Sequence, residues 1–247
     1  MTLVALGLTA FGGCNEDIFL GTEAIFWSAN SETGDISQWL EGGDAAGGKV
    51  LTSDAQLTAV TSPPPHSGRY ALGASISTTT SASYARLFRC GQLPQDLYYS
   101  IWVLIPARYT VAVYWNLFEF QGRADPAIAT AYSLLWSLDL GPPTASGDLP
   151  WYLYDSIRGK QLGPATQVVA PIGRWFRIEA FMHQATDSTG RVTFWIDGSL
   201  FLDVTGVSTV PSHWLEWAVG SATNDITEKP AEIFIDDAQI SRVGPGK

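Results

Sequence analysis

The chain has 247 residues, of which 46% are hydrophobic and only 15% are charged, and its 14 Lys and Arg face 24 Asp and Glu. The resulting net charge of −10 argues against a nucleic-acid partner, because phosphate binding needs a clustered positive surface. Ten Trp, nine Tyr and eleven Phe supply ample material for a core. Few charges remain to coat exposed helices, so the composition favours strands and turns. A neutral glycan, a cation or a protein partner fits this chain more easily than a strongly anionic polymer does, unless the few arginines gather in one groove.

The first fourteen residues, MTLVALGLTAFGGC, form an apolar segment that ends in small residues and Cys14. This order resembles the end of a bacterial lipoprotein signal, in which the cysteine is lipidated and becomes the new N-terminus. The segment departs from that pattern at Phe11 and carries no Lys or Arg before its apolar run. It is too short to span a bilayer as a helix. We therefore predict an exported protein, either extracellular or held at the bacterial cell envelope, with membrane contact only through a lipid on Cys14. The alternative is an apolar first strand with a buried thiol.

From Ile25 onward, short apolar runs alternate with Gly- and Pro-rich breakers, which is typical of strands between turns. Helical periodicity is not sustained anywhere, although DISQW (35–39) predicts one helical turn. Residues 141–149 read as a long loop within one domain. We expect a single all-β domain over residues 23–243, folded as a two-sheet antiparallel sandwich. The predicted strands cover residues 24–29, 49–60, 69–77, 83–90, 97–105, 112–121, 131–140, 150–156, 174–184, 191–197, 199–204, 214–220 and 231–242.

Two segments predict a hairpin with clearly assigned faces. RWFRIEAFMH and RVTFWIDG flank a DSTG turn, so residues 174–184 should pair with residues 191–197. The period of two places charged and aromatic side chains on the outer face. The inner face is predicted to hold Phe176, Ile178, Ala180, Met182, Val192, Phe194 and Ile196, and the outer face Arg177, Glu179, Phe181, His183, Thr193 and Trp195.

A third segment, WNLFEFQGR (115–123), alternates polar side chains with phenylalanines. Read as a strand, it sends Phe118 and Phe120 to a core. The opposite face is predicted to line a groove and to carry Trp115, Glu119, Gln121 and Arg123. Alternatively, Glu119 and Arg123 neighbour Arg177 and Glu179 in a cross-strand charge ladder, which stabilises a sheet modestly.

Five phrases together resemble the concanavalin A-like jelly rolls, particularly bacterial polysaccharide lyases of the heparin lyase I type. They are HSGRYAL (66–72), YYSIWVLIPARYT (98–110), WNLFEFQGR (115–123), GRWFRIEAFMHQATDSTGRVTFWIDG (173–198) and IFIDDAQIS (233–241). The resemblance covers about residues 25–242 and implies a jelly-roll sandwich. It is less specific for activity, because this sandwich carries lyases, glycosidases and lectins.

Jelly-roll lyases often carry a Gln-x-His pair in which the amide holds the sugar carboxylate and the imidazole removes a proton. By register this pair falls on Glu119 and Gln121, so an acid replaces the amide and an amide replaces the base. The resemblance then implies that Gln121 and Arg123 neutralise a uronate carboxylate. A base must come from elsewhere, and a tyrosine can serve as both base and acid. The remaining candidates for it are His183, Tyr152 and Tyr154.

The same face also suits a protein that only binds glycans. Aromatic rings stack on sugar faces, while acids and arginines hydrogen-bond hydroxyls. A third class, a structural surface subunit with a protein partner, remains open as well. A glycosidase is disfavoured: Glu119, Glu179, Glu216 and Asp139 are available carboxylates, but no Glu-x-Asp run occurs among them. The predicted substrate contacts are Trp115, Glu119, Arg86, Arg177, Glu179 and Trp195.

The two ends of the domain suggest a structural cation. FWSANSETGDISQW (26–39) and IFIDDAQIS (233–241) are similar to the first and last strands of jelly rolls that share a calcium ion. This resemblance implies Glu32, the Gly34 carbonyl and Asp237 as calcium ligands, since calcium prefers carboxylate and carbonyl oxygens. Alternatively, one of Asp236 and Asp237 is buried with backbone hydrogen bonds and the other is exposed. Three His and two Cys without ligand spacing do not indicate zinc.

Overall fold

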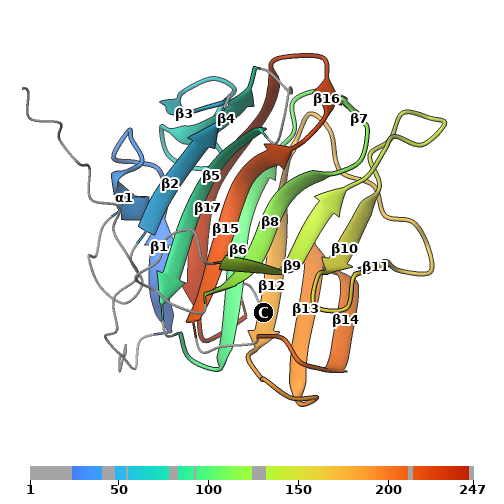
Figure 1. Cartoon of the computed structure of the whole chain (residues 1–247). Helices are drawn as coiled ribbons and strands as arrows, with labels where there is room; N and C mark the ends of the chain where they lie inside the picture. The colour runs from blue at the N-terminus through green and yellow to red at the C-terminus, as the bar shows by residue number, and fades with distance from the viewer. Residues whose placement is uncertain are drawn as a thin grey trace, which may run out of the picture.

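The structure is a computed structural model that describes residues 24–40, 48–53, 55–77, 83–91, 93–123, 132–210 and 214–244. These residues form many strands and one short helix (Figure 1). In chain order the elements are β1 (Ile25–Ala29), α1 (Ser37–Leu40), β2 (Gly48–Ser53), β3 (Ala55–Val60), β4 (Ala71–Ile76), β5 (Ser83–Gly91), β6 (Asp96–Leu104), β7 (Thr110–Val111), β8 (Trp115–Arg123), β9 (Tyr132–Leu140), β10 (Trp151–Asp155), β11 (Lys160–Leu162), β12 (Trp175–His183), β13 (Gly190–Ile196), β14 (Ser199–Val207), β15 (Trp214–Thr223), β16 (Ile226–Thr227) and β17 (Ala231–Ser241).

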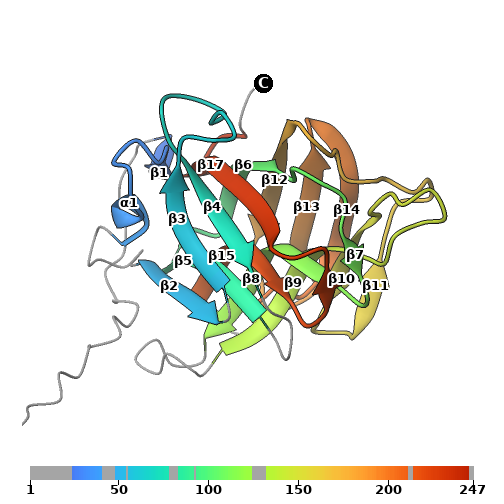
Figure 2. The ribbon, with the colours of Figure 1, turned by 90° about the horizontal axis from the view of Figure 1, so that it is seen from above.

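Two large antiparallel sheets lie face to face (Figures 1 and 2). The eight-stranded sheet has the order β14-β13-β12-β6-β17-β4-β3, with β1 paired to β17. The seven-stranded sheet has the order β11-β10-β9-β8-β15-β5-β2, and β7 and β16 form a small separate pair. Neighbours within each sheet are often distant in the sequence, as in a jelly roll. The predicted two-sheet antiparallel jelly roll is confirmed.

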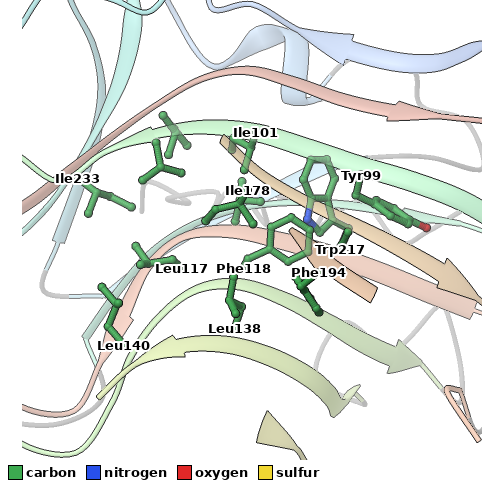
Figure 3. Packing of buried hydrophobic residues seen from close by; sticks show 14 of the residues in the cluster. Tyr99, Ile101, Leu117, Phe118, Leu138, Leu140, Ile178, Phe194, Trp217 and Ile233 are labelled. Carbon is green, nitrogen blue, oxygen red and sulfur yellow. The ribbon is translucent and has the colours of Figure 1, made fainter. Parts of the chain in front are cut away.

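The core fills the space between the two sheets with the inward side chains of alternate residues. Phe118 of β8, Phe194 of β13 and Trp217 of β15 meet there, and the Phe118 ring centroid lies 5.4 Å from each of the other two (Figure 3). Phe176 and Ile178 are 0% exposed, as predicted. Removing one such buried ring typically costs about 3–5 kcal/mol. This packing fixes which side chains of each strand remain on the outside of the sandwich.

The predicted hairpin is confirmed, with Ile178 opposite Ile196 and Met182 opposite Val192. The helical turn predicted for DISQW corresponds to α1. The expectation that the first and last strands lie side by side also holds, because β1 pairs with β17.

The prediction of a single strand over residues 49–60 is wrong. It divides into β2, which pairs with β5 in the seven-stranded sheet, and β3, which pairs with β4 in the eight-stranded sheet. A segment that looks like one strand in the sequence can therefore pass from one sheet to the other, which periodicity alone does not reveal.

Candidate functional site

A pocket of about 580 Å³ lies against the polar face of the seven-stranded sheet, and we call it the central pocket. On β8 the pocket residues Glu119 and Gln121 alternate with the core residues Phe118 and Phe120. The expected separation of the polar and phenylalanine faces holds at these four positions. The central pocket takes further polar side chains from β5, β9 and β10, among them Arg86, Ser137, Asp139, Tyr152 and Tyr154.

Trp115 departs from the expected alternation. It is 0% exposed, belongs to the core and donates its indole N–H to the Ser221 hydroxyl at 2.7 Å, so its predicted role as a sugar platform is wrong. The reason is a register irregularity in β8 between Asn116 and Phe118, where an extra residue changes which side chains face the core. Asn116 consequently takes the place in the pocket that the period of two assigned to Trp115.

One arginine organises the floor of the central pocket. The Arg86 guanidinium lies 2.8 Å from Glu119 Oε2 and also donates a hydrogen bond to Asn116 Oδ1. Gln121 Nε2 donates to the other oxygen, Glu119 Oε1. Both carboxylate oxygens of Glu119 are thus engaged. Among the described residues that line this pocket, Arg86 is the only cationic side chain.

Asp139 of β9 extends this network. Its carboxylate accepts hydrogen bonds from Asn116 Nδ2 at 2.7 Å and from the Ser137 hydroxyl at 2.8 Å, and the residue is only 4% exposed. Burial raises the pKa of Asp139 to about 6; the negative charge of Glu119 adds to the rise, while the two hydrogen bonds and Arg86 oppose it. Asp139 is therefore a carboxylate that can exchange a proton near neutral pH.

Tyr152 of β10 faces Asp139 directly, because the two residues are cross-strand partners in the β9–β10 pair. Burial raises the pKa of Tyr152 far above its usual range, and a hydrogen bond to the Asp139 carboxylate raises it further. The hydroxyl is consequently a neutral proton donor. Tyr154 lies opposite Ser137 and lines the same pocket. The structure thus brings together five of the predicted site residues, namely Arg86, Glu119, Gln121, Tyr152 and Tyr154.

A second pocket of about 580 Å³, which we call the side pocket, adjoins the first. The two share Tyr152 and Gln161 in their walls. The side pocket is further lined by Pro142, Pro164 and Gln167. In the part of the chain that the structure describes, its walls contain no charged side chain. Tyr152 therefore stands between the polar central pocket and an uncharged side pocket.

Four other predicted residues lie on the opposite sheet. Arg177, Glu179 and His183 belong to β12 and Trp195 to β13, so they do not share the central pocket with Gln121. The expectation of one common groove is corrected for them, and the proposed ladder between Glu119 and Arg177 is wrong for the same reason. A period of two assigns a side chain to a face of its strand but does not say to which sheet the strand belongs.

These residues have local partners of their own. Arg177 Nη2 lies 2.9 Å from Glu179 Oε2, and burial raises the pKa of Glu179 against the opposing effect of Arg177. His183 Nδ1 lies 2.8 Å from Asp96 Oδ1. Trp195 stands opposite Glu179 in the β12–β13 pair.

A loop covers part of this outer face, and we call the residues His66, Trp102, Trp175, Arg177 and Glu179 the outer cluster. The His66 ring stacks on Trp102 with centroids 3.7 Å apart. Trp175 donates its indole N–H to the carbonyl of Pro64 at 3.0 Å. The loop is thus packed against the sheet by its own side chains.

Asp236 anchors the same loop from beneath. Its Oδ2 accepts the backbone N–H groups of His66 at 3.1 Å and Ser67 at 3.2 Å. Burial raises the pKa of Asp236 to about 6, and the neighbouring charge of Asp237 adds to the rise. The alternative prediction, in which one of the two aspartates is buried with backbone hydrogen bonds, describes Asp236.

The residues predicted to bind calcium do not form a ready site. Glu32 Oε1 accepts the backbone N–H groups of Arg69 at 2.8 Å and Tyr70 at 3.0 Å. The Asp237 oxygens lie 2.6 Å from His66 Nδ1 and 2.9 Å from the Ser67 hydroxyl. In the described ranges no group of three or more His, Cys, Asp or Glu could hold a metal ion. Protein donors thus occupy one oxygen of Glu32 and both oxygens of Asp237, Gly34 lies in a turn with φ of 74°, and calcium binding at these residues stays a prediction.

Two predicted site residues lie partly or wholly outside what the structure describes. The backbone of Arg123 ends β8 opposite Tyr132 and Trp214, but its side chain lies outside what the structure describes. Cys14, the predicted lipidation site, also lies outside the described residues. No helix among those residues is long and apolar enough to cross a membrane.

Comparison with solved structures identifies the fold. Over 89% of this chain and 96% of the other, it is similar to an endo-β-1,4-glucuronan lyase from the fungus Trichoderma reesei, with a TM-score of 0.63 at 14% identity. An alginate lyase from Aplysia kurodai matches with a TM-score of 0.57 at 14% identity, over 90% of this chain and 100% of the other. Alginate lyase vAL-1 from Chlorella virus matches with a TM-score of 0.55 at 11% identity, over 89% and 100%. No family model matches the sequence, and no curated protein matches it. The chain therefore has the jelly-roll fold of these polysaccharide lyases.

Sequence reasoning missed several polar members of the site, among them Asn116, Ser137 and Gln161, and considered Asp139 only as a glycosidase carboxylate. The sequence does contain a signal for Ser137 and Asp139, because SLDL alternates polar and apolar residues in the strand that precedes WYLYD. The sequence contains no such signal for Asn116, because the irregularity in β8 changes the face on which its side chain lies.

Proposed function

We propose that the protein acts on a uronate-containing polysaccharide by β-elimination in a groove formed by the central and side pockets. The observation that carries this proposal is the convergence of a tyrosine hydroxyl, a guanidinium and two amide groups at one open pocket. These groups belong to Tyr152, Arg86, Asn116 and Gln121. A lyase needs such donors for the sugar carboxylate beside a group that transfers protons.

The chemistry requires stabilisation of negative charge on the uronate carboxylate when the proton on C5 leaves. Arg86 supplies this charge stabilisation, since a guanidinium has five N–H donors and its ion pair with Glu119 uses only part of them. Gln121 contributes amide N–H groups on the same face. Preorganised donors of this kind are usually the largest single contribution to lowering such a barrier.

Tyr152 is positioned for the proton transfers, and Tyr154 stands two residues along the same strand. In the assignment we propose, Tyr152 removes the C5 proton and Tyr154 protonates the leaving oxygen. No histidine occurs among the described residues that line the central pocket, so a tyrosine takes the role that a histidine has in many jelly-roll lyases. His183, the other candidate base, lies on the opposite sheet.

The shape of the site favours a polymer. Tyr152 and Gln161 line both pockets, so open space lies beside Tyr152 in the central pocket and in the side pocket. The uncharged walls of the side pocket suit sugar rings and hydroxyls. The lyase names of the structural neighbours agree with a uronate polymer as substrate.

Export and attachment through Cys14 belong to the same proposal, because polymers of this kind are met outside the cell. Labelling with a radioactive fatty acid would test the attachment. A lipidated protein incorporates the label, and the Cys14→Ala variant does not.

A second candidate function is glycan binding without catalysis. Its specific support is the acidic balance of the pocket, in which Glu119 and Asp139 face the single cation of Arg86. A binding module needs donors and open space but no base. It would retain affinity for oligosaccharides while releasing no product.

The test is absorbance at about 235 nm during incubation with glucuronan, alginate, pectate and heparin-type chains, together with a reducing-end assay. The proposal predicts rising absorbance with at least one polymer, because β-elimination leaves an unsaturated sugar. New reducing ends without absorbance would indicate hydrolysis and contradict it. Oligosaccharide binding measured by calorimetry, with both assays flat for the folded protein, would establish the binding module instead.

A further inference from the structure

We infer that Asp139 is the proton acceptor behind Tyr152, so that the two residues form a relay in which the tyrosine touches the substrate and the aspartate receives the proton. This inference rests on the proposed function and assigns a positioning role to a residue that does not itself contact the reacting carbon. The strand register brings the two side chains together, because Tyr152 and Asp139 are direct cross-strand partners.

Hydrogen-bond donors hold the Asp139 carboxylate in a fixed orientation and oppose the burial that raises its pKa. Asn116 Nδ2 and the Ser137 hydroxyl donate to Oδ1 and Oδ2 at 2.7 and 2.8 Å, and the Tyr152 hydroxyl is a third hydrogen-bond partner. Three donors around one carboxylate favour its charged form. Asp139 lines the central pocket but is only 4% exposed, and Tyr152 is its hydrogen-bond partner among the groups proposed to transfer protons.

A purely structural acceptor would not need this charge. Burying an ionised carboxylate costs several kcal/mol unless it is paired and hydrogen-bonded. Arg86, the nearby cation, is already paired with Glu119. The chain therefore maintains a carboxylate at a position where a neutral side chain could also accept hydrogen bonds, and the relay gives that charge a use.

The proposed step balances as follows. The C5–H bond of the uronate breaks, and its proton passes to the Tyr152 oxygen while the Tyr152 O–H proton passes to an oxygen of Asp139. The electron pair left at C5 forms the C4=C5 double bond, and the C4–O4 bond breaks with its electrons on the leaving oxygen. The Tyr154 hydroxyl protonates that oxygen and regains its proton from water. Asp139 afterwards returns its proton to solvent through Tyr152.

The relay makes the rate depend on pH through Asp139. The charged and titratable groups that act on Asp139 are Arg86 from β5, Glu119 from β8 and Tyr152 from β10, while Tyr114 and Tyr154 act on Tyr152. Because burial raises the pKa of Asp139 to about 6, the proton acceptor is available above that pH and is lost below it. The rate should therefore rise with pH through this range.

The test compares the pH profile of kcat in the wild type, Asp139→Asn and Asp139→Glu, with Asp236→Asn as the matched control on the opposite sheet. We expect Asp139→Asn to lower kcat by about 100-fold at pH 7 and to remove the acidic limb of the profile. Asp139→Glu should recover part of the rate and restore a limb, whereas a merely structural role would leave the limb in place. Asp236→Asn should leave the profile unchanged.

A measurement without substrate separates this inference from the proposed function. The NMR signal of tyrosine labelled with ¹³C at Cζ, assigned with Tyr152→Phe, should show a lower Tyr152 pKa in Asp139→Asn than in the wild type. An unchanged Tyr152 pKa, or a kcat of Asp139→Asn within about threefold of the wild type with the same profile, overturns the relay. Absence of unsaturated product from the wild type on every polymer overturns the proposed function and the relay with it.

Discussion

The central pocket and the outer cluster contain nearly the same chemistry on opposite sheets. Each has an arginine–glutamate ion pair, of 2.8 Å between Arg86 and Glu119 and of 2.9 Å between Arg177 and Glu179. Each also lies near a buried aspartate whose pKa is raised to about 6 by its surroundings. Residue types, ion pairs and pKa shifts therefore do not distinguish the two regions.

The difference lies in what covers them. The outer cluster is packed under its own loop, with His66 stacked on Trp102 at 3.7 Å and Trp175 bonded to the Pro64 carbonyl. The central pocket retains about 580 Å³ of space beside Tyr152. The same polar groups stabilise a loop where that loop occupies the space, and they are available to a ligand where the space is open.

The largest expected effect comes from replacing an arginine with methionine, which keeps an unbranched side chain but removes the charge. Arg86→Met should reduce product formation from a uronate polymer by about 100- to 1000-fold, because it removes the cation from the pocket. Arg177→Met should leave the rate unchanged, since that arginine lies on the opposite sheet. Initial rates at about 235 nm measure both.

The control for this pair is the double variant Arg86→Met/Glu119→Gln. It leaves no unpaired charge on the pocket floor and so separates loss of chemistry from loss of stability. An active double variant, or an Arg177→Met variant as impaired as Arg86→Met, would contradict the assignment of function to the central pocket.

The two aspartates offer a second comparison through pH. Because the folded-state pKa of Asp139 and Asp236 is about 6, above the ordinary aspartate value of 3.8, each contributes stability that is complete below pH about 4 and is lost as pH rises through about 6. A shift of this size corresponds to up to about 3 kcal/mol for each group. The free energy of unfolding in denaturant, measured for the wild type, Asp139→Asn and Asp236→Asn at several pH values, should show this dependence in the difference between the wild type and each variant. A difference that does not vary with pH would show that the aspartate has an ordinary pKa.

A smaller effect should separate stability from function at Gly68, which belongs to the loop over the outer cluster. Its φ is 60°, and an added Cβ would lie 2.3 Å from the Glu32 carboxylate. Gly68→Ala should therefore destabilise the fold by about 2 kcal/mol through backbone strain and displacement of Glu32. At this chain length, the unfolding temperature should fall by several degrees, because each kcal/mol lowers it by roughly 2–4 °C. Oligosaccharide affinity should not change, and a parallel loss of affinity would show that the two sheets are coupled.

The smallest expected effect concerns calcium. One oxygen of Glu32 and both oxygens of Asp237 already have protein partners, so calcium followed by a chelator should shift the unfolding temperature by less than about 1 °C. An increase of several degrees that is lost in Asp237→Asn would instead establish the calcium site that the sequence suggests.

The sequence predicted the sandwich because its strands are bounded by strong breakers and alternate cleanly, as Phe176 and Ile178 illustrate. It predicted part of the site for the same reason, at Glu119, Gln121 and Tyr152. It failed at Trp115, where an irregularity in β8 exchanges the two faces. It also failed at Arg177, because local periodicity does not determine which sheet a strand joins.

The most direct test of this account compares one candidate base on each sheet. Tyr152 lines the central pocket, whereas His183 pairs with Asp96 on the opposite sheet. Initial rates at about 235 nm on the polymer that the wild type cleaves should be nearly abolished by Tyr152→Phe and unchanged by His183→Ala. Full activity in Tyr152→Phe together with its loss in His183→Ala would place the chemistry on the other sheet and contradict the account.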